Sequence, residues 1–281
     1  MSVDLKRIGE ICQKHWDNTY GPARNFVPVS NTLAVKIGEW PWGEEDLKYE
    51  HAWLEYMASN ADSKRVVVPK PHGPVITHGD LNLLLMDFIH GDSIAMHLKD
   101  GHPLDKEVAD KICDAYLALR EIPPQPDKLC PTGWWPIRGH IFAPDKDGGL
   151  TLESPLAFSE YMDDRLTQAH DGKTTILPET EVVFNHGDLS PNNIIQLPDG
   201  RIGIVDLGMA LWGPTYWDLY ALTICSYKHE FVAPMNQAFA RRGLTIDPTT
   251  EEMLWKFSVW HFRNGNAVAR QVLRIDRKDI R

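Results

Sequence analysis

The sequence predicts an α+β fold in which a small lobe built around an antiparallel sheet precedes a larger, mainly helical lobe. Short β-prone runs separated by turns occupy much of the first part of the chain, and helical periodicity dominates the remainder. A chain of 281 residues, 43% of them apolar, can also bury a substantial core. We place the boundary near Gly91, so that residues 1–91 form the expected N-terminal lobe and residues 92–281 the C-terminal lobe.

One strand of the expected N-terminal sheet contains a single lysine. Residues Thr32–Ile37 are apolar or β-branched, with Lys36 as their charged member. This lysine either faces solvent or meets a buried partner, and taken alone the solvated position is the simpler interpretation. Further strands are expected at Val66–Val68, Pro74–His78 and Leu83–Ile89.

A helix is expected over Glu44–Ala58, and it offers Lys36 a partner. Its inward-facing stripe recurs at intervals of three and four positions and consists of Leu47, Glu50, Leu54 and Met57. Glu50 could therefore pair with Lys36, although an exposed helix charge is the simpler interpretation of Glu50 alone. Other acidic residues of the same helix compete for this role, namely Glu44, Glu45 and Glu55.

Helical patterns fill the second lobe. Ser154 and Pro155 combine an N-cap residue with a first-turn proline, which indicates a helix start. The pair Pro123-Pro124 ends the helix before it. The expected helices are Leu104–Ile122, one that begins at Ser154, one near Thr215–His229 and one over Thr250–Phe262.

The tripeptide His-Gly-Asp occurs three times, at 78–80, 90–92 and 186–188, so the tripeptide alone indicates little. After the third copy come Asn193, an apolar run, a Pro-Asp-Gly turn and a second apolar run that ends before Asp206. Two such runs across a turn predict a β-hairpin, which brings Asn193 and Asp206 to the same end. We interpret the first two copies as structural turns.

Asp188, Asn193 and Asp206 have the residue types and order of a phosphoryl-transfer site. Protein kinases use H-R-D-L-x-x-x-N, whose Asp accepts the substrate hydroxyl proton and whose Asn holds magnesium, and then D-F-G, whose Asp holds magnesium. Mg²⁺ prefers oxygen ligands, so one carboxylate and one amide suffice when ATP supplies the rest. The sequence predicts Asp188 as the base and Asn193 and Asp206 as magnesium ligands. The alternative is a surface loop with helix-capping aspartates.

The segment 184–219, FNHGDLSPNNIIQLPDGRIGIVDLGMALWGPTYWDL, resembles the aminoglycoside phosphotransferase-like branch of the protein-kinase-like fold, and its ending is similar to that of fungal members. The resemblance covers most of the chain. It implies a bilobal protein-kinase-like fold, ATP as co-substrate and Mg²⁺ as cofactor. It also implies the roles given above for Asp188, Asn193 and Asp206.

The same resemblance suggests a nucleotide site in the N-terminal lobe. Kinases carry a V-A-I-K strand whose lysine contacts ATP phosphates and pairs with a helix glutamate, and Lys36 and Glu50 are the candidates here. The run Leu84–Ile89 resembles the hinge strand of kinase-like folds. This implies that the backbone of Asp87, Phe88 and Ile89 meets the adenine, with Met86 at the back of its pocket. A buried central strand is the alternative, and both can hold.

One expected kinase feature is missing from the sequence. Kinases cover the ATP phosphates with a glycine-rich loop, whereas residues 1–35 contain only Gly9 and Gly21. Two functions therefore stay open. The first is an ATP-dependent O-phosphotransferase, and the second is a catalytically lapsed kinase-like module that binds a nucleotide, a metabolite or a protein partner.

The expected acceptor is a small hydroxylated molecule, such as an antibiotic or a secondary metabolite. Protein kinases need a long segment between D-F-G and A-P-E to support a peptide, whereas here Asp206 is followed within twelve residues by Trp217-Asp218. Trp212, Trp217 and Asp218 are candidate acceptor-binding residues, because aromatic rings and a carboxylate can hold an ammonium group. Alternatively, the tryptophans belong to the core and Asp218 braces the catalytic loop.

Composition narrows the classes of molecule that the protein is expected to bind. The formal charge of −10 argues against nucleic acid and is compatible with a cationic acceptor. The cysteines have no metal-ligand spacing, which predicts reduced thiols at Cys12, Cys113, Cys130 and Cys225. The N-terminal segment lacks an apolar leader and no run of 18 apolar residues exists. We therefore expect a cytoplasmic protein that does not bind membranes.

Overall fold

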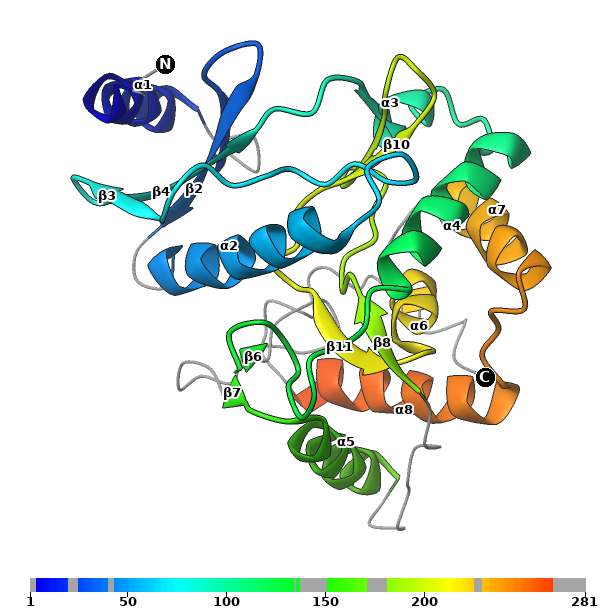
Figure 1. The fold of residues 1–281 in the computed structure, drawn as a ribbon. Helices are drawn as coiled ribbons and strands as arrows, with labels where there is room; N and C mark the ends of the chain where they lie inside the picture. The colour runs from blue at the N-terminus through cyan, green and yellow to red at the C-terminus, as the bar shows by residue number, and fades with distance from the viewer. Residues whose placement is uncertain are drawn as a thin grey trace. The chain divides into compact units, whose positions relative to one another are not determined.

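The computed structural model describes two compact units (Figure 1). Unit 1 contains Met1–Ile122 and Ser190–Ala210, and unit 2 contains Pro123–Leu189 and Leu211–Arg281. This division differs from a boundary at Gly91, because unit 1 continues to Ile122 and also includes the later segment Ser190–Ala210. The functional lobes 1–91 and 92–281 stay a prediction. The described residues are 4–19, 25–39, 43–133, 135–136, 151–170, 181–224 and 229–264.

Unit 1 is built around a four-stranded antiparallel sheet in the order β1-β2-β4-β3. Its strands are β1 (Phe26–Pro28), β2 (Leu33–Glu39), β3 (Ile76–His78) and β4 (Leu81–Asp87). This confirms the strand expected around Lys36 and the hairpin expected near residues 74–89. The strand expected at Val66–Val68 is wrong, because Val67 forms only an isolated parallel bridge with Gly203.

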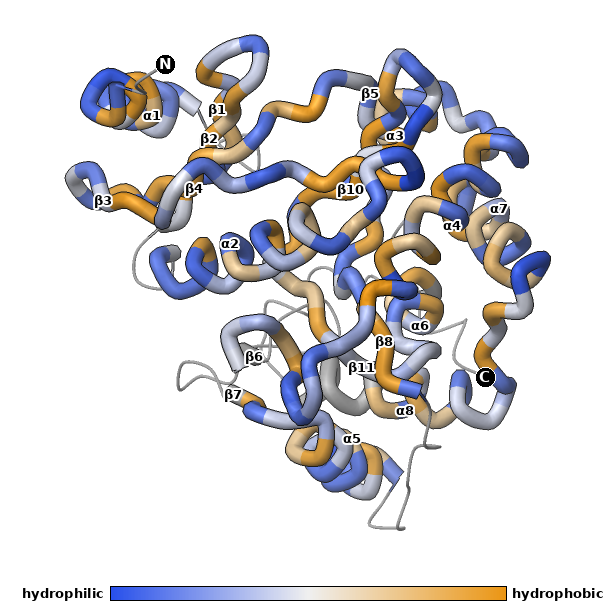
Figure 2. Tube along the Cα trace, in the orientation of Figure 1, coloured by the Kyte–Doolittle hydropathy of each residue, from blue (hydrophilic) through white to orange (hydrophobic). Residues whose placement is uncertain are grey.

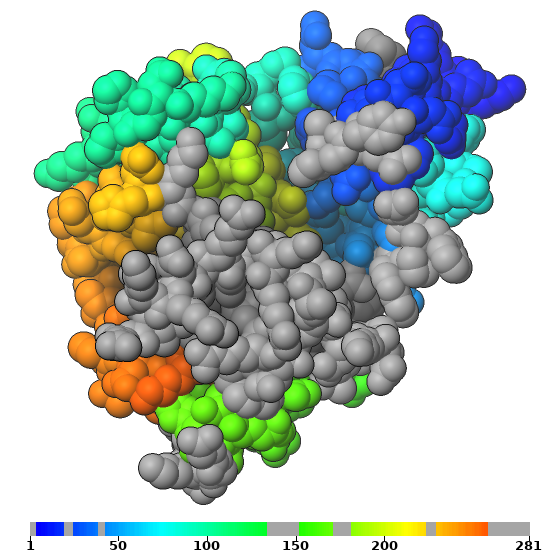
Figure 3. Space-filling view, turned by 180° about the vertical axis from the view of Figure 1, so that it is seen from behind, coloured from blue at the N-terminus to red at the C-terminus, as the bar shows by residue number. Residues whose placement is uncertain are grey.

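Two helices lie on opposite sides of this sheet, α1 (Leu5–Asn18) and α2 (Gly43–Asn60) (Figure 1). Helix α2 spans the helix expected over Glu44–Ala58 and therefore confirms it. Helix α1 contains both hydrophobic and hydrophilic residues (Figure 2). Its outer side lies at the surface of unit 1, in dark blue in Figure 3.

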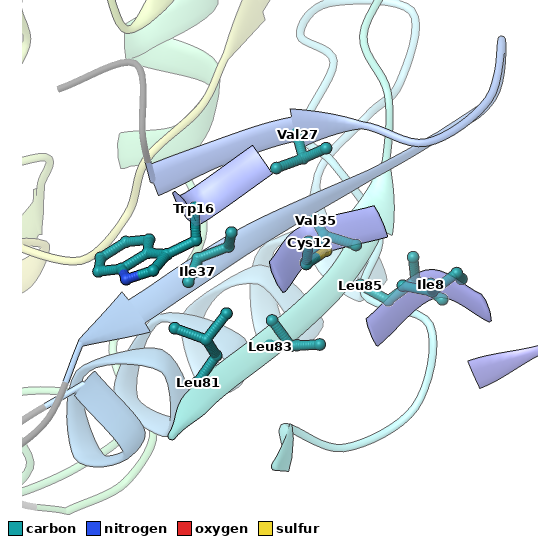
Figure 4. Packing of buried hydrophobic residues seen from close by; sticks show 9 residues of the cluster. All are labelled: Ile8, Cys12, Trp16, Val27, Val35, Ile37, Leu81, Leu83 and Leu85. Atoms are coloured by element: carbon teal, nitrogen blue, oxygen red, sulfur yellow. The ribbon is translucent and has the colours of Figure 1, made fainter. Parts of the chain in front are cut away.

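Sequence reasoning did not identify α1, although a signal for it exists. Ile8, Cys12 and Trp16 are spaced four residues apart and are buried against one face of the sheet (Figure 4). Asp4 caps the helix by accepting the Arg7 N–H at 3.1 Å. The sheet side chains in this cluster are Val27, Val35, Ile37, Leu81, Leu83 and Leu85.

The predicted hairpin is present in unit 1 as β9 (Ile194–Gln196) and β10 (Ile202–Ile204). The strands are antiparallel, with Ile194 opposite Ile204. A short strand, β5 (Asp92–Ser93), pairs with β9. After β5 the chain forms two helices, α3 (Ile94–His97) and α4 (Lys106–Arg120). Helix α4 confirms the helix expected over Leu104–Ile122.

Unit 2 contains two short strand pairs and the remaining helices. The strands are β6 (Trp135–Pro136), β7 (Thr151–Leu152), β8 (Val182–Asn185) and β11 (Leu211–Pro214), with β8 paired to β11 and β6 to β7. The helices are α5 (Pro155–Ala169), α6 (Trp217–Ile224), α7 (His229–Arg241) and α8 (Pro248–Asn264). The Ser154 hydroxyl accepts the Ala157 N–H, so the helix start expected there is confirmed.

Sequence reasoning missed α7, which contains Pro234 in its interior. A proline normally indicates a helix end. Among the described cysteines, Cys12, Cys113 and Cys130 are buried and not part of a disulfide, and burial raises the pKa of Cys12 to about 11. Cys225 lies outside the described residues.

Over the described ranges, none of the helices combines the length and the apolar character needed to cross a membrane.

Candidate active site

The three His-Gly-Asp copies have different surroundings. In the first, Gly79 has a φ of 59° in the turn between β3 and β4. In the second, Gly91 has a φ of 154°, and an added Cβ would lie 2.3 Å from the carbonyl oxygen of Gln196. Both positions require glycine for a backbone reason. For the first copy this agrees with the interpretation as a structural turn. The second copy does not form the expected turn, because its Asp92 begins β5 and pairs with Gln196 of β9.

The hairpin joins Asn193 to Asp206. Asn193 directly precedes β9, and its carbonyl oxygen accepts the Val205 N–H at 3.0 Å. Asp206 follows with a φ of 64°, a left-handed conformation that Asp tolerates better than most residues. The prediction that Asn193 and Asp206 stand at the same end of the hairpin is confirmed.

Lys36 contacts two carboxylates of unit 1. Its Nζ lies 2.5 Å from Oε2 of Glu50 and 2.7 Å from Oδ1 of Asp206. The predicted pairing of Lys36 with Glu50 is therefore confirmed. The contact with Asp206 joins residues 170 positions apart, and no local sequence pattern predicts it.

Burial and charge act in opposite directions at this cluster. Burial raises the pKa of Glu50 to about 7, while the Lys36 ammonium opposes this shift. Burial also disfavours the charged form of Lys36, but the neighbouring carboxylates of Glu50 and Asp206 outweigh it and raise the pKa of Lys36. Lys36 therefore keeps its positive charge at neutral pH.

Helix α2 holds the segment after Asp206 at a second point. The buried Tyr49 hydroxyl donates a hydrogen bond to the carbonyl oxygen of Ala210. Glu50, one residue further along α2, binds Lys36 and is only 2% exposed. The helix thereby fixes both the lysine and the stretch that follows β10.

Asp206 and Asn193 have the chemistry of magnesium ligands. The Asp206 side chain is 43% exposed, so its carboxylate can accept a further ligand. Over the residues that the structure describes, no group of three or more His, Cys, Asp or Glu side chains could hold a metal. A carboxylate and an amide oxygen nevertheless fit Mg²⁺, which completes its coordination with water and phosphate oxygens. The metal role of these two residues stays a prediction.

The end of β4, where the adenine is expected, already uses two of its backbone donors. The Asp87 N–H donates to the Lys70 carbonyl and the Phe88 N–H to the Thr32 carbonyl, both at 2.9 Å. Met86 is buried opposite Ala34 of β2. An adenine contact at this segment would therefore use the Ile89 N–H or backbone carbonyl oxygens.

The third His-Gly-Asp copy lies in unit 2, directly after β8, and is held by Asp218. The Asp218 carboxylate accepts the His186 N–H at 2.5 Å and the Gly187 N–H at 2.8 Å. The Asp188 N–H donates to Nδ1 of His186 at 3.2 Å, so this ring nitrogen is unprotonated. Asp218 is 1% exposed and His186 is fully buried. The backbone on the N-terminal side of Asp188 is thus fixed by a buried carboxylate.

The candidate acceptor residues lie in the interior of unit 2. Trp212 is fully buried, and Trp217 is 2% exposed with its ring edge-on to Phe158 at 5.2 Å. Asp218 is occupied by the loop it braces. These positions favour the alternative interpretation, core packing for the tryptophans and a brace for Asp218, and the acceptor role of these residues stays a prediction.

Residues 24–255 match the model of the phosphotransferase enzyme family. The chain belongs to this family. The resemblance stated from the motif around Asp188 is therefore confirmed, and the family match covers most of this chain. A comparison with curated proteins found no match.

Solved structures of aminoglycoside phosphotransferases share the fold. APH(4)-Ia is 10% identical with a TM-score of 0.56, and the match covers 92% of this chain and 90% of that one. The GDP complex of aminoglycoside 2'-phosphotransferase-IIIa is 14% identical with a TM-score of 0.56, covering 99% and 94%. A ternary complex of a thermostable APH(4)-Ia mutant with AMP-PNP and hygromycin B is 11% identical with a TM-score of 0.53, covering 82% and 77%. The predicted protein-kinase-like α+β fold is confirmed.

Proposed function

We propose that this protein transfers the γ-phosphoryl group of ATP to a hydroxyl group of a small molecule. The observation that carries this proposal is the cluster in which Lys36 binds both Glu50 and Asp206. A lysine held between a helix glutamate and the aspartate that follows the hairpin is the arrangement that kinases use to bind ATP phosphates and magnesium.

Lys36 would bind the ATP phosphates. Its ammonium stays charged because two carboxylates adjoin it. Glu50 is nearly buried and orients the lysine, while the partly exposed Asp206 can exchange its contact with Lys36 for a metal ion. The backbone from Asp87 to Ile89 would meet the adenine, with Met86 behind it.

Asn193 and Asp206 would hold Mg²⁺ together with phosphate oxygens. When bound, the ion supplies positive charge that neutralises the transferred phosphoryl group. The described hairpin supports this proposal because it fixes the backbone of Asn193 to that of Val205, next to Asp206. These residues supply oxygen ligands of the kind that Mg²⁺ prefers.

Asp188 would act as the base. Its carboxylate orients the acceptor hydroxyl and takes its proton as the hydroxyl oxygen bonds to the γ-phosphorus. The bond between that phosphorus and the bridging oxygen to the β-phosphate breaks, and ADP leaves. The bonds from Asp218 to the His186 and Gly187 N–H groups support this role, because they fix the backbone that carries Asp188.

The acceptor would be a small hydroxylated molecule, and a cationic one is compatible with the formal charge of −10. After Asp206 the chain continues through β11 to α6 at Trp217. This short connection supports a small acceptor over a protein, because peptide substrates need a longer supporting segment. The ternary complex of the APH(4)-Ia mutant suggests the first compound to test, hygromycin B.

The test combines binding and turnover. We expect Mg-ATP at a hundred times its dissociation constant to stabilise the protein by about 2.7 kcal/mol, which raises the unfolding midpoint by about 5–10 °C for a chain of this size. ATP with a chelator should give a smaller shift. ADP release should then rise when the correct hydroxylated amine or sugar is added.

A protein that shows no shift with Mg-ATP would refute the proposed nucleotide site. A magnesium-dependent shift without ADP release for any acceptor, or for water, would instead favour a lapsed module that binds nucleotide. The missing glycine-rich pattern in residues 1–35 motivates that second candidate.

A further inference from the structure

Asn185, the last residue of β8, carries a buried amide group that the proposed reaction does not use. The residue is fully buried, and in the strand register it lies opposite Leu211 of β11. A buried amide group is costly unless its donor and its acceptor are both paired. Its Nδ2 donates to the Val183 carbonyl oxygen at 3.1 Å, and its Oδ1 accepts the Asp218 N–H at 3.3 Å. The side chain therefore connects β8 to the start of α6.

The Asp218 N–H belongs to the first turn of α6, where a helix needs acceptors from outside. The first N–H groups of a helix have no carbonyl oxygen of the same helix to bind. Helix α6 begins at Trp217, so Asp218 is its second residue. Asp218 is 1% exposed, so bulk water has little access to this group. The Asn185 side chain supplies an acceptor at this buried position.

Hydrogen bonds run in both directions between the same two segments. The Asp218 carboxylate accepts the His186 and Gly187 N–H groups. The Asn185 side chain accepts the Asp218 N–H in return. Three consecutive residues thus bind Asp218, and bonds of opposite direction fix the rotation of the loop as well as its distance from α6. Asp188 follows directly, after Gly187 with its left-handed φ of 78°.

This position favours a neutral acceptor of the size of asparagine. Asn185→Asp would place a second negative charge close to the Asp218 carboxylate, and Asn185→Leu would remove the acceptor of the Asp218 N–H. There is little room for a larger group, because a Cβ added at Gly213 would already lie 3.4 Å from Nδ2 of Asn185. The amide side chain meets both conditions.

We propose that Asn185 is a positioning residue for the base of the transfer reaction. Because it is fully buried, it acts through Asp218, which holds the backbone that leads to Asp188. This inference rests on the proposed function and adds a residue to it. The candidate nucleotide-binding residues Lys36 and Asp206 lie in unit 1, whereas Asn185 lies in unit 2. The role therefore predicts an effect on kcat and none on Mg-ATP affinity.

The first arm of the experiment needs no substrate. Hydrogen–deuterium exchange followed by mass spectrometry measures the opening of the peptide that contains His186 and Gly187, in the wild type and in Asn185→Leu. Loss of one buried hydrogen-bond partner should speed the exchange of these amides by about tenfold. Unfolding midpoints show whether each variant is folded. If Asn185→Leu is unfolded, Asn185→Ser replaces it, since it leaves a small polar group and room for water.

The second arm measures turnover and binding in the same variants, with water as the acceptor or with hygromycin B where it raises ADP release. Asn185→Leu should lower kcat by about 10–100-fold, because a small misplacement of a reacting group slows the reaction strongly. The Kd for Mg-ATP should stay at the wild-type value. A double variant with Asp218→Asn should lose little more kcat than Asp218→Asn alone, because both substitutions disrupt the same set of bonds.

The matched control is Thr250→Val. The buried Thr250 hydroxyl donates to the Asp247 carboxylate at the start of α8, also in unit 2. This variant also loses a buried hydrogen bond, so its unfolding midpoint should fall. Its kcat, and its exchange at His186 and Gly187, should match those of the wild type.

The outcomes separate this inference from the proposed function. A wild type that releases no ADP with any acceptor overturns the proposed function, and the positioning role with it. A wild type that turns over, beside a folded Asn185 variant with unchanged kcat or unchanged exchange, overturns the role of Asn185 alone. Fully additive losses in the double variant, or weaker Mg-ATP binding at unchanged kcat, overturn that role as well.

Discussion

Asp206 in unit 1 and Asp218 in unit 2 are held in opposite ways. The Asp206 side chain is 43% exposed and pairs with the Lys36 ammonium. Asp218 is 1% exposed, and its carboxylate oxygens accept two backbone N–H groups. A partly exposed carboxylate that pairs with a side-chain cation can exchange that partner for another cation. The buried Asp218 carboxylate instead accepts the backbone N–H groups of His186 and Gly187 and so fixes a loop. The same residue type therefore serves two different roles in the two surroundings.

The largest effect is expected beside the buried brace, at Asp188. Asp188→Asn should lower ADP release by about 10²–10⁴-fold, because the amide cannot accept the hydroxyl proton. Mg-ATP affinity should stay close to the wild-type value. The matched control is Asp80→Asn, which changes the same tripeptide at an exposed turn and should leave turnover intact. Unchanged turnover in Asp188→Asn would exclude Asp188 as the base.

The next largest effect concerns the exposed aspartate. Asp206→Ala should abolish the magnesium-dependent part of the thermal shift, which is the difference between the about 2.7 kcal/mol expected with a hundredfold excess of Mg-ATP over its dissociation constant and the smaller value with ATP and chelator. Asp199→Ala is the control, since this exposed aspartate lies at the turn of the same hairpin and pairs with Arg201. A thermal shift in Asp206→Ala that still depends on magnesium would dismiss Asp206 as a metal ligand.

The brace itself is tested by Asp218→Asn. The substitution keeps the shape but removes the charge that two backbone N–H groups bind, so the free energy of unfolding should fall by about 2 kcal/mol. We expect kcat to fall, while the Kd for Mg-ATP changes little. Glu160→Gln removes one charge from an exposed position of α5 and should change neither quantity. If Asp218→Asn weakened Mg-ATP binding and left kcat intact, the contrast with Asp206 would break down.

The smallest effect is expected at Glu50. Glu50→Gln should weaken Mg-ATP binding by about fivefold, or about 1 kcal/mol, because the amide can still accept a hydrogen bond from Lys36 and Asp206 remains as a charged partner. Calorimetry of Mg-ATP binding checks this. Glu44→Gln on the same helix removes an exposed pair with Lys48 and provides the control. Equal affinities in the two variants would show that Glu50 does not orient Lys36 for the phosphates.

Local patterns predicted the parts of the site that lie close together in sequence. Two apolar runs across a turn were enough to place Asn193 and Asp206 at one end of a hairpin, since strand pairing across a short turn is a local property. Helical spacing likewise placed Glu50 on the inward side of α2. The pairing of Lys36 on β2 with Glu50 on α2 stayed one of two open interpretations from local pattern alone, and the resemblance to the kinase V-A-I-K strand favoured it.

Contacts between distant segments could not be predicted in this way. The ion pair between Lys36 and Asp206 depends on where the end of the hairpin lies relative to β2. The spacing of apolar residues along the sequence does not predict this position. For Asp218, the sequence left two roles open, and only burial and two hydrogen bonds distinguish them. The helix α7 was missed because Pro234 normally indicates a helix end.

The two ends of the β9–β10 hairpin differ, because one carries the candidate metal ligands and the other is a surface turn. The candidate metal ligands stand where the strands enter and leave, whereas the turn at 198–200 lies three residue pairs away. Gly200 there has a φ of 84° and open space around it. A few extra residues grafted into this turn should leave nucleotide binding unchanged. The turn is therefore a suitable place for a peptide tag or a fluorescent reporter that leaves both chain ends free.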